Sequence, residues 1–141
     1  MNCERLIFMR DNLDVSQRDM AKLLKVSKST YGRWETGEKI IPLEHLIDFC
    51  NITKIDLDYA IGLSERKTKL TNEIIIDRIK IGNNLKRIRN LNNLTQKEFA
   101  ESINTVQSVI SSYEKAITLI QTSFLYDICC KYNISSKSII N

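Results

Sequence analysis

Apolar residues recur along the chain at the three- and four-residue spacing of amphipathic helices. Met20, Leu23 and Leu24 follow this spacing in the first half of the chain, and Phe99 and Ile103 follow it in the second half. Apolar runs are far shorter than a membrane span requires. The pattern predicts an all-α protein of short helices that does not enter a membrane.

The predicted helices begin at residues that commonly cap helix N-termini. Ser16 and Thr95 are each followed three residues later by an acidic residue, which is the arrangement of a capping box. Ser27 is suited to cap a helix over residues 28–35, which Gly37 would end. These signals predict where the second and third helices of the chain begin.

Two further short helices are expected before the middle of the chain. Pro42 suits the first turn of a fourth helix that ends near Asn51. A fifth helix would end at Gly62, and either Thr53 or Asp56 would cap it. We therefore expect five short helices in this part of the chain.

The chain repeats itself. Shifting it by 79 residues aligns 5–62 with 84–141 without a gap, and twelve aligned positions are identical, where chance would give roughly four. We expect one domain over residues 1–64, a linker over 65–82 and a second, more divergent domain over 83–141.

Inside the expected linker, the triplet Ile74–Ile76 interrupts charged and polar sequence. It would form either a short strand or an apolar contact with one of the domains, and the sequence leaves both open. The N-terminus lacks the apolar core of a secretory signal, so we expect a cytoplasmic protein.

The charge distribution favours a nucleic-acid partner. The net charge is only +4, with an isoelectric point near 8.9. However, residues 16–39 hold six basic residues against three acidic ones. One face of the first domain is therefore expected to be positive.

Metal, cofactor and catalytic sites have little to build on. The four cysteines form no Cys-x-x-Cys pair, and the chain has one histidine, His45, for which we expect a surface position. We expect buried, reduced thiols. Without a paired nucleophile and base, neither an enzyme nor a resident cofactor or metal is expected.

Residues 16–37 have the pattern of a helix-turn-helix, with a capped helix of two turns, a tight turn and a second capped helix. Ala21 lies where the helices would cross, and its small side chain lets them approach. Tyr31 and Trp34 give the second helix an apolar inner side. The residues left outside are polar and partly cationic, as a major-groove contact needs. They are Lys28, Ser29, Thr30, Gly32 and Arg33.

This stretch resembles the Cro/phage-repressor, or XRE-type, helix-turn-helix family. The resemblance is carried by Ser16-Gln17, Ala21, Val26-Ser27, the Ser29–Trp34 helix, Glu35 with Gly37, and Leu57-Asp58-Tyr59-Ala60-Ile61-Gly62. It covers both repeats, and in the second it is good over residues 94–100 and at Tyr113-Glu114 but weaker elsewhere. It implies two tandem five-helix domains of the lambda-repressor type that bind double-stranded DNA, in a bacterial or phage regulator.

The resemblance implies roles for matching residues of the first repeat. Gln17 would contact a phosphate and brace the reading helix, and Lys39 would contact a phosphate from the following loop. The residues facing DNA would be Ser27, Lys28, Ser29, Thr30 and Arg33, of which Lys28, Ser29 and Arg33 lie near base edges. The pairs Arg10 with Glu35 and Arg89 with Glu114 resemble a family ion pair that ties the first helix of each repeat to the reading helix.

The second repeat departs from the pattern. Val106 replaces Ser27, and Ala116 replaces Gly37. The outward residues, none of them basic, are Gln107, Ser108, Ser111 and Ser112. Extra apolar surface is expected at Val109 and Ile117. The candidate DNA contacts that remain are Gln96, Gln107, Ser108 and Ser112, with Gln107 suited to adenine.

Two functions stay open at this point. The first is a sequence-specific transcriptional regulator, in the first place a repressor, that reads the major groove through the third helix of each repeat. In the second, the first repeat binds DNA while the second repeat is a homodimerisation or protein-docking module, which includes antitoxin and anti-repressor roles.

Overall fold

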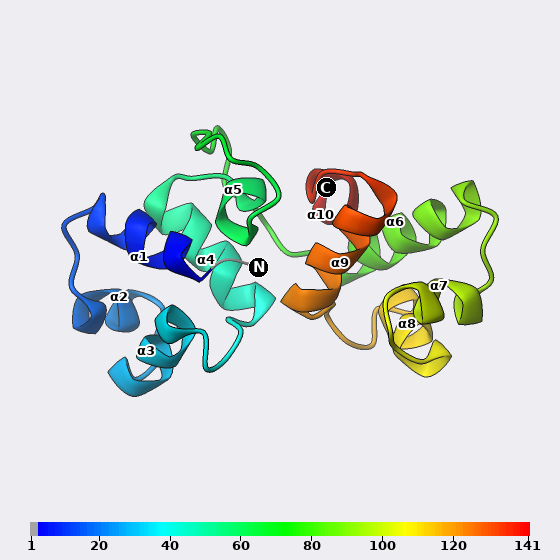
Figure 1. Cartoon of the computed structure of the whole chain (residues 1–141), viewed down its shortest axis with the longest axis horizontal. Coiled ribbons are helices and arrows are strands. Elements are labelled where there is room, and N and C mark those ends of the chain that lie inside the picture. Colours follow the sequence, from blue (N-terminus) through cyan, green and yellow to red (C-terminus); the bar gives the residue numbers. More distant parts are fainter. Residues whose placement is uncertain (1–2) are drawn as a thin grey trace. The chain divides into compact units, whose positions relative to one another are not determined.

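The computed structural model describes residues 3–141, and within that range it is entirely helical apart from loops and one isolated β-bridge (Figure 1). The helices are α1 (Glu4–Asp11), α2 (Gln17–Leu23), α3 (Lys28–Thr36), α4 (Leu43–Thr53), α5 (Leu57–Ile61), α6 (Arg78–Leu91), α7 (Gln96–Ser102), α8 (Gln107–Glu114), α9 (Thr122–Tyr132) and α10 (Lys137–Ile140). The chain divides into a first unit that ends at Ile75 and a second unit, Ile76–Asn141. The predicted all-α fold, with five helices in each repeat, is confirmed.

The predicted capping residues occupy the N-termini of the helices. The Ser16 hydroxyl accepts a hydrogen bond from the Asp19 amide at 3.1 Å. Thr95 and Glu98 form a complete capping box, in which each side chain accepts from the other residue's backbone amide. Of the two residues considered for α5, Asp56 is the cap. These local bonds satisfy amides that the first turn of a helix leaves without partners.

The loops of the two units repeat the same backbone conformation. Four pairs of residues with positive φ angles are separated by the same 79 positions that relate the repeats, namely Asp14 and Asn93, Lys25 and Asn104, Gly37 and Ala116, and Lys54 and Asn133. Asparagine and aspartate adopt this left-handed region more readily than lysine does. Among these residues of the second unit, Ala116 has a strained backbone. Its φ is 60°, whereas the equivalent Gly37, which lacks a Cβ atom, has a φ of 81°.

Each unit has its own apolar core. Tyr31, Trp34, Phe99 and Tyr113, expected inside, are all buried. In the first unit the Tyr31 ring lies against Phe49, with centroids 6.4 Å apart. Because large aromatic side chains contribute much of the buried apolar area, these contacts fix the third helix of each unit against the rest of its domain.

In the second unit, α6 and α8 approach closely at Gly82. A Cβ atom at this position would lie 2.5 Å from the Tyr113 carbonyl oxygen and 2.9 Å from that of Glu114. Both atoms belong to the backbone of α8, so neither can move aside on its own. The absence of a side chain at Gly82 therefore sets the distance between α6 and α8.

The range expected as a linker, residues 65–82, includes the first residues of α6. Helix α6 begins at Arg78 because the Asp77 carboxylate accepts from the amides of Ile79 and Lys80. The triplet Ile74–Ile76 forms no strand. Instead, the Asn51 side chain accepts from the Ile74 amide and donates to its carbonyl, at 2.8 and 2.9 Å.

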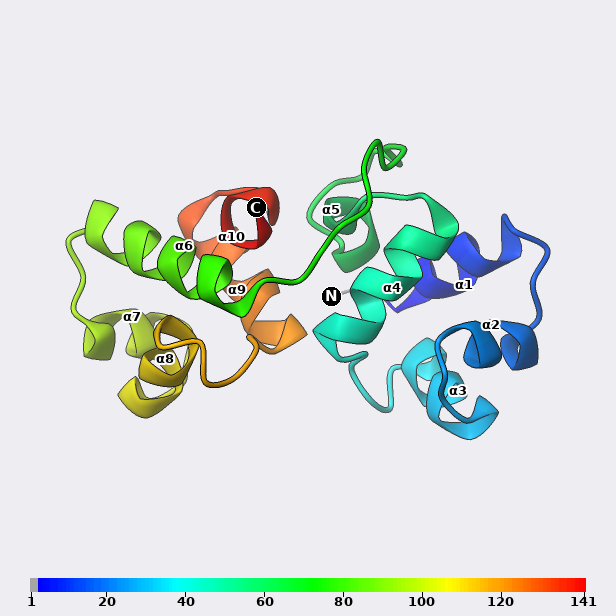
Figure 2. The same cartoon turned by 180° about the vertical axis from the view of Figure 1, so that it is seen from behind.

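Residues 66–70 form an extended segment, here called the strap, that lies along the end of α4. The Asp56 amide donates to the Thr68 carbonyl and the Leu70 amide donates to the Lys54 carbonyl, at 2.9 and 2.8 Å. An antiparallel bridge joins Ile55 to Lys69. Figures 1 and 2 place the strap beyond α5, on the side of the first unit opposite to α3.

The thiols differ from expectation. Cys50 and Cys129 are buried, but Cys3 is half-buried and Cys130 is exposed, so the expectation of four buried thiols is wrong for those two. His45 is half-buried rather than on the surface, because its ring lies 5.3 Å from that of Trp34. Across residues 3–141 no helix is long and apolar enough to cross a membrane, and no cluster of side chains suited to a metal ion occurs there.

Candidate nucleic-acid interface

Helices α2 and α3 pack closely in the first unit and leave one side of α3 free. Ala21, the small residue expected at their crossing, is 2% exposed. The Ser27 hydroxyl caps α3 by accepting from the Thr30 amide at 3.0 Å. Gly37 ends the helix in the left-handed conformation. Because Tyr31 and Trp34 hold the inner side of α3, the opposite side is presented to solvent.

The exposed residues of this side, here called the first reading face, are Ser27, Lys28, Ser29, Thr30, Arg33 and Lys39. The backbone ties the loop to the helix, because the Lys39 amide donates to the Arg33 carbonyl at 3.2 Å. The only acidic side chain paired with this face among the described residues is Glu38, whose carboxylate lies 3.9 Å from the Arg33 guanidinium. Such an exposed ion pair contributes little to stability, so Arg33 and Lys39 both stay available to an anionic partner.

A buried network braces α3 from behind. The Glu35 carboxylate accepts from Arg10 Nε at 2.7 Å, from Arg10 Nη2 at 3.1 Å and from Gln17 Nε2 at 2.9 Å. Its side chain is 3% exposed. The Arg10–Glu35 pair inferred from the family resemblance is therefore present, and Gln17 joins it.

The network also sets the ionisation of its members. Burial raises the pKa of Glu35, but the hydrogen bonds from Arg10 and Gln17 and the nearby Tyr31 hydroxyl together outweigh burial, and the net pKa lies below its usual value. The pKa of Arg10 is raised, chiefly by its hydrogen bond to Glu35. Both groups are thus charged at neutral pH; the pair anchors α1 to α3, and Gln17 anchors α2 to the same carboxylate.

Gln17 connects this network with the surface. While its amide nitrogen donates to Glu35, its Oε1 atom lies 3.9 Å from where a Cβ atom of Gly32 would be. Gln17 therefore reaches from the inner network to the outward side of α3. It is half-buried, whereas the other candidate residues of the first unit are exposed.

The second unit repeats the bracing network. Arg89 donates to both oxygens of Glu114 at 2.8 and 3.0 Å, and Gln96 donates to the same carboxylate at 3.2 Å. Arg89 also donates to the Leu94 carbonyl, as Arg10 does to that of Val15. The supporting framework of α8 is thus the same as that of α3.

The outward side of α8 is chemically different. Val106 begins the helix without a side-chain cap and is 61% exposed. Gln107 and Ser108 are exposed, and the Gln107 amide nitrogen lies 3.5 Å from Gln96 Oε1. Ser112 is half-buried. Together with Gln96, these residues form the second reading face, which carries no charged side chain.

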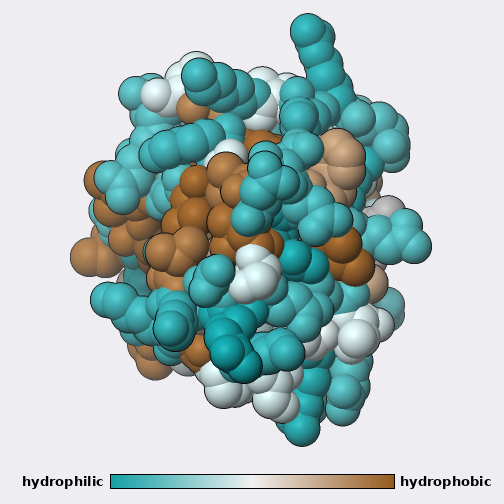
Figure 3. All heavy atoms as spheres, turned by 90° about the vertical axis from the view of Figure 1, so that its left-hand side faces the viewer, coloured by the Kyte–Doolittle hydropathy of each residue, from teal (hydrophilic) through white to brown (hydrophobic). Residues whose placement is uncertain are grey.

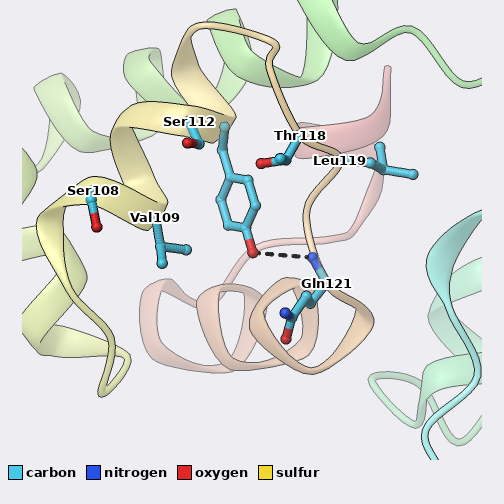
Figure 4. A pocket seen from close by; sticks show the side chains of 7 residues that line it. Ser108, Val109, Ser112, Thr118, Leu119 and Gln121 are labelled. Atoms are coloured by element: carbon cyan, nitrogen blue, oxygen red, sulfur yellow. Dashed lines mark hydrogen bonds between the residues drawn. The ribbon is translucent and has the colours of Figure 1, made fainter.

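A shallow pocket of about 300 Å³ lies beside the second reading face. In Figure 4, Ser108, Val109 and Ser112 from α8 face Thr118 and Leu119 of the following loop and Gln121 at the start of α9. Inside it, the Gln121 amide donates to the Tyr113 hydroxyl at 3.4 Å. The lining is uncharged and mixes hydroxyl groups with apolar side chains, so it suits a neutral rather than an anionic surface.

The sequence pattern anticipated the residues of both faces but not all of their surroundings. Val109, expected to be exposed, is half-buried, because the loop that follows α8 folds back beside it, whereas Ile117 is 61% exposed as expected. Sequence reasoning also missed the pocket. The sequence signal that could have revealed the pocket is that the second repeat has Thr118 and Gln121 at the positions where the first repeat has Lys39 and Pro42.

Comparisons with known proteins agree with this geometry. The profile of a family described as Helix-turn-helix matches residues 6–59 and 85–138. The chain is 29% identical over 65 residues to the uncharacterized HTH-type transcriptional regulator YobD of Bacillus subtilis, which covers 46% of this chain and 58% of that protein. It is 35% identical over 60 residues to the antitoxin PezA of Streptococcus pneumoniae, which covers 43% of this chain and 38% of that protein. The chain thus spans about half the length of these relatives, and no solved structure matches it significantly.

Proposed function

Because the chain belongs to the XRE-type helix-turn-helix family, of which it contains two tandem copies, we propose that it binds double-stranded DNA and regulates transcription by occupying its site. The observation that carries this proposal is the first reading face, which presents Lys28, Arg33 and Lys39 on a helix braced by the Arg10–Gln17–Glu35 network. A rigid helix with exposed bases and hydroxyl groups suits the major groove. This function places the protein in the cytoplasm, with DNA.

The residues of the first reading face divide the work between affinity and selection. Lys39, with Gln17 and Ser27 at the helix ends, contacts phosphates, which supply affinity without regard to sequence. Lys28, Ser29 and Arg33 approach base edges. Lysine and arginine favour guanine, and each good bidentate contact discriminates by about 1–3 kcal/mol. Thr30 lies at the edge of this set.

A binding titration tests the division. Arg33→Ala is expected to lower the ratio of specific to non-specific affinity, because it removes a base contact. Lys39→Ala is expected to weaken binding to all sequences and to reduce the slope of affinity against salt by about one charge. Equal effects of the two variants on the specificity ratio would contradict these roles.

The second reading face is proposed to contact the same DNA more weakly. Gln107, supported by Gln96, is suited to adenine, while Ser108 and Ser112 bond either kind of base pair. Without basic side chains this face gains little from phosphates. Selection of duplexes from a random pool by the full chain should therefore recover two unequal half-sites about one helical turn apart.

A second candidate function is favoured by the apolar surface of the second unit. Val106 and Ile117 are each 61% exposed, and the pocket of the same unit is uncharged, so this unit suits a protein surface, either a second copy of the chain or another factor. One relative is an antitoxin by name. Selection of a single half-site or a palindrome would favour this function over reading by both units.

The two candidates predict different behaviour in solution. If the second unit mediates self-association, the mass measured by sedimentation rises with concentration. The double variant Val106→Ser and Ile117→Glu, which installs the residues that the first repeat has at these positions, should then abolish the rise. A concentration-independent monomer in both proteins would leave DNA contact as the role of the second unit.

A further inference from the structure

An open cavity of the first unit is lined by a basic cluster that the reading faces do not use. The cavity measures about 440 Å³ and lies where the strap crosses the end of α4. Its lining residues are Asn12, Leu13, Thr53, Lys54, Ile55, Lys67 and Lys69. This volume falls within the range of small-molecule sites.

The backbone fixes the positions of the three lysines. Lys67 and Lys69 flank Thr68, whose carbonyl accepts from the Asp56 amide, and Lys69 is bridged to Ile55. Because side chains alternate along an extended segment, residues two apart point to the same side. Lys54 lies on the opposite wall, at the left-handed residue that ends α4, with a φ of 61°. Three lysines thus line one cavity.

No carboxylate lines this cavity to balance the charge. Among residues 3–141, no acidic group lies within 4 Å of the ammonium nitrogens of these lysines. Lys67 is held over the Phe8 ring at 5.4 Å from its centroid. The partial negative charge at the end of α4 is only about half of one charge, so it does not neutralise the three cations.

The remaining lining residues suit a ligand that is partly organic. Asn12 offers a side-chain amide, whereas the buried Thr53 hydroxyl already donates to the Phe49 carbonyl at 2.8 Å. Leu13, which is 39% exposed, and Ile55 form an apolar wall. Figure 3 looks onto the first unit from the side of α1 and α2, and hydrophobic residues gather at the centre and left of this face among hydrophilic ones.

We propose that this cavity binds a small molecule bearing two or more phosphate groups. Lysine is a common ligand of phosphate as a point charge, and three lysines on a cavity of this size match a multiply charged anion better than a single carboxylate. The strap and α3 lie on opposite sides of the first unit, so a duplex held on the first reading face does not supply these phosphates (Figures 1 and 2). The site is therefore independent of the proposed function.

The experiment titrates sodium pyrophosphate and tripolyphosphate into the full chain by calorimetry, at constant ionic strength so that screening does not change. The test variant combines Lys54→Asn, Lys67→Gln and Lys69→Gln. Asparagine is chosen at position 54 because Asn133 holds the same left-handed conformation at the equivalent position of the second unit. The control combines Lys80→Gln, Lys86→Gln and Lys131→Gln, which removes the same charge from exposed sites of the second unit.

Wild type and control should bind both probes in a saturable manner with affinities within about twofold, while the test variant loses at least about tenfold, the equivalent of about 1.4 kcal/mol. Unchanged unfolding by Trp34 fluorescence, which reports the first unit, shows that the test variant is folded. No saturable binding by wild type up to about 10 mM probe, or equal losses in both variants, overturns the proposal.

A parallel titration with duplex DNA distinguishes the two sources of phosphate. If the cavity serves a small molecule, the test variant and the control bind duplex equally well. If the test variant loses duplex affinity and the probes do not bind, the lysines contact a DNA backbone and the small-molecule proposal fails. Failure of all duplex binding with retained probe binding would overturn only the function proposed for the reading faces.

Discussion

The hydrogen-bond network of Glu35 with Arg10 and Gln17 is expected to contribute strongly to the free energy of unfolding of the first unit. Glu35→Gln keeps the size of the side chain but replaces one oxygen, which accepts from arginine, by an amide group that donates. Arg10 then keeps its bond to the Val15 carbonyl and its pair with the exposed Asp11 carboxylate at 3.4 Å, but loses the buried carboxylate of Glu35, although its own side chain is only 13% exposed. Removing one partner of a buried ion pair costs about 3–5 kcal/mol. Because Arg10 retains the Val15 bond, the Asp11 pair and some solvent contact, we expect the low end of this range, about 3 kcal/mol.

The assay uses the only tryptophan of the chain. Trp34 lies on α3 in the first unit, so its fluorescence during urea unfolding reports that unit alone. For a unit of this size, the free energy of unfolding falls by about 1 kcal/mol for each molar increase in urea concentration. The midpoint of the Trp34 transition is therefore expected to fall by about 2–3 M, and DNA affinity should fall with it because α3 loses its support.

A matched control is available at the repeat offset. Glu114→Gln breaks the equivalent network in the second unit and should leave the midpoint of the Trp34 transition in place, provided that the units unfold independently. A midpoint of Glu35→Gln within about 0.5 M of wild type would refute the assignment of this network as the support of α3. Equal shifts in both variants would show that the effect is not local.

Four other predictions concern single positions. Gly82→Ala should destabilise the second unit by about 1–3 kcal/mol in thermal unfolding, since its Cβ would lie 2.5 Å from the Tyr113 carbonyl oxygen; a more stable variant would contradict the close approach. Ala116→Gly should stabilise the same unit by about 0.5–1 kcal/mol, because it relieves a φ of 60° but enlarges the unfolded ensemble. Ser27→Ala should cost the first unit about 1 kcal/mol in the Trp34 transition by removing the cap of α3, and no change would argue against the bond to Thr30. Because folding lowers the pKa of Glu35, its contribution is complete above the unfolded value near 4.3 and is lost as pH falls through the folded value; Glu35→Gln should lack this acid-dependent loss in a stability profile.

Local features were readable from the residues alone. Helix spacing, caps and glycine helix ends depend on contacts within about four residues, so Ser27, Thr95 and Gly37 identify their elements without knowledge of the fold. The repeat offset then transferred each assignment to the other half of the chain. The partners Arg10 and Glu35 were inferable because the family pattern links them across 25 residues.

Contacts between distant segments required the packed structure. Residue spacing does not indicate that the strap would bring Lys67 and Lys69 to Lys54, because that approach depends on backbone bonds formed only once α4 and α5 are in place. The half-buried state of Val109 likewise depends on how the loop after α8 folds back beside it. Periodicity specifies which side of a helix is apolar, whereas the partner of each surface is set by tertiary packing.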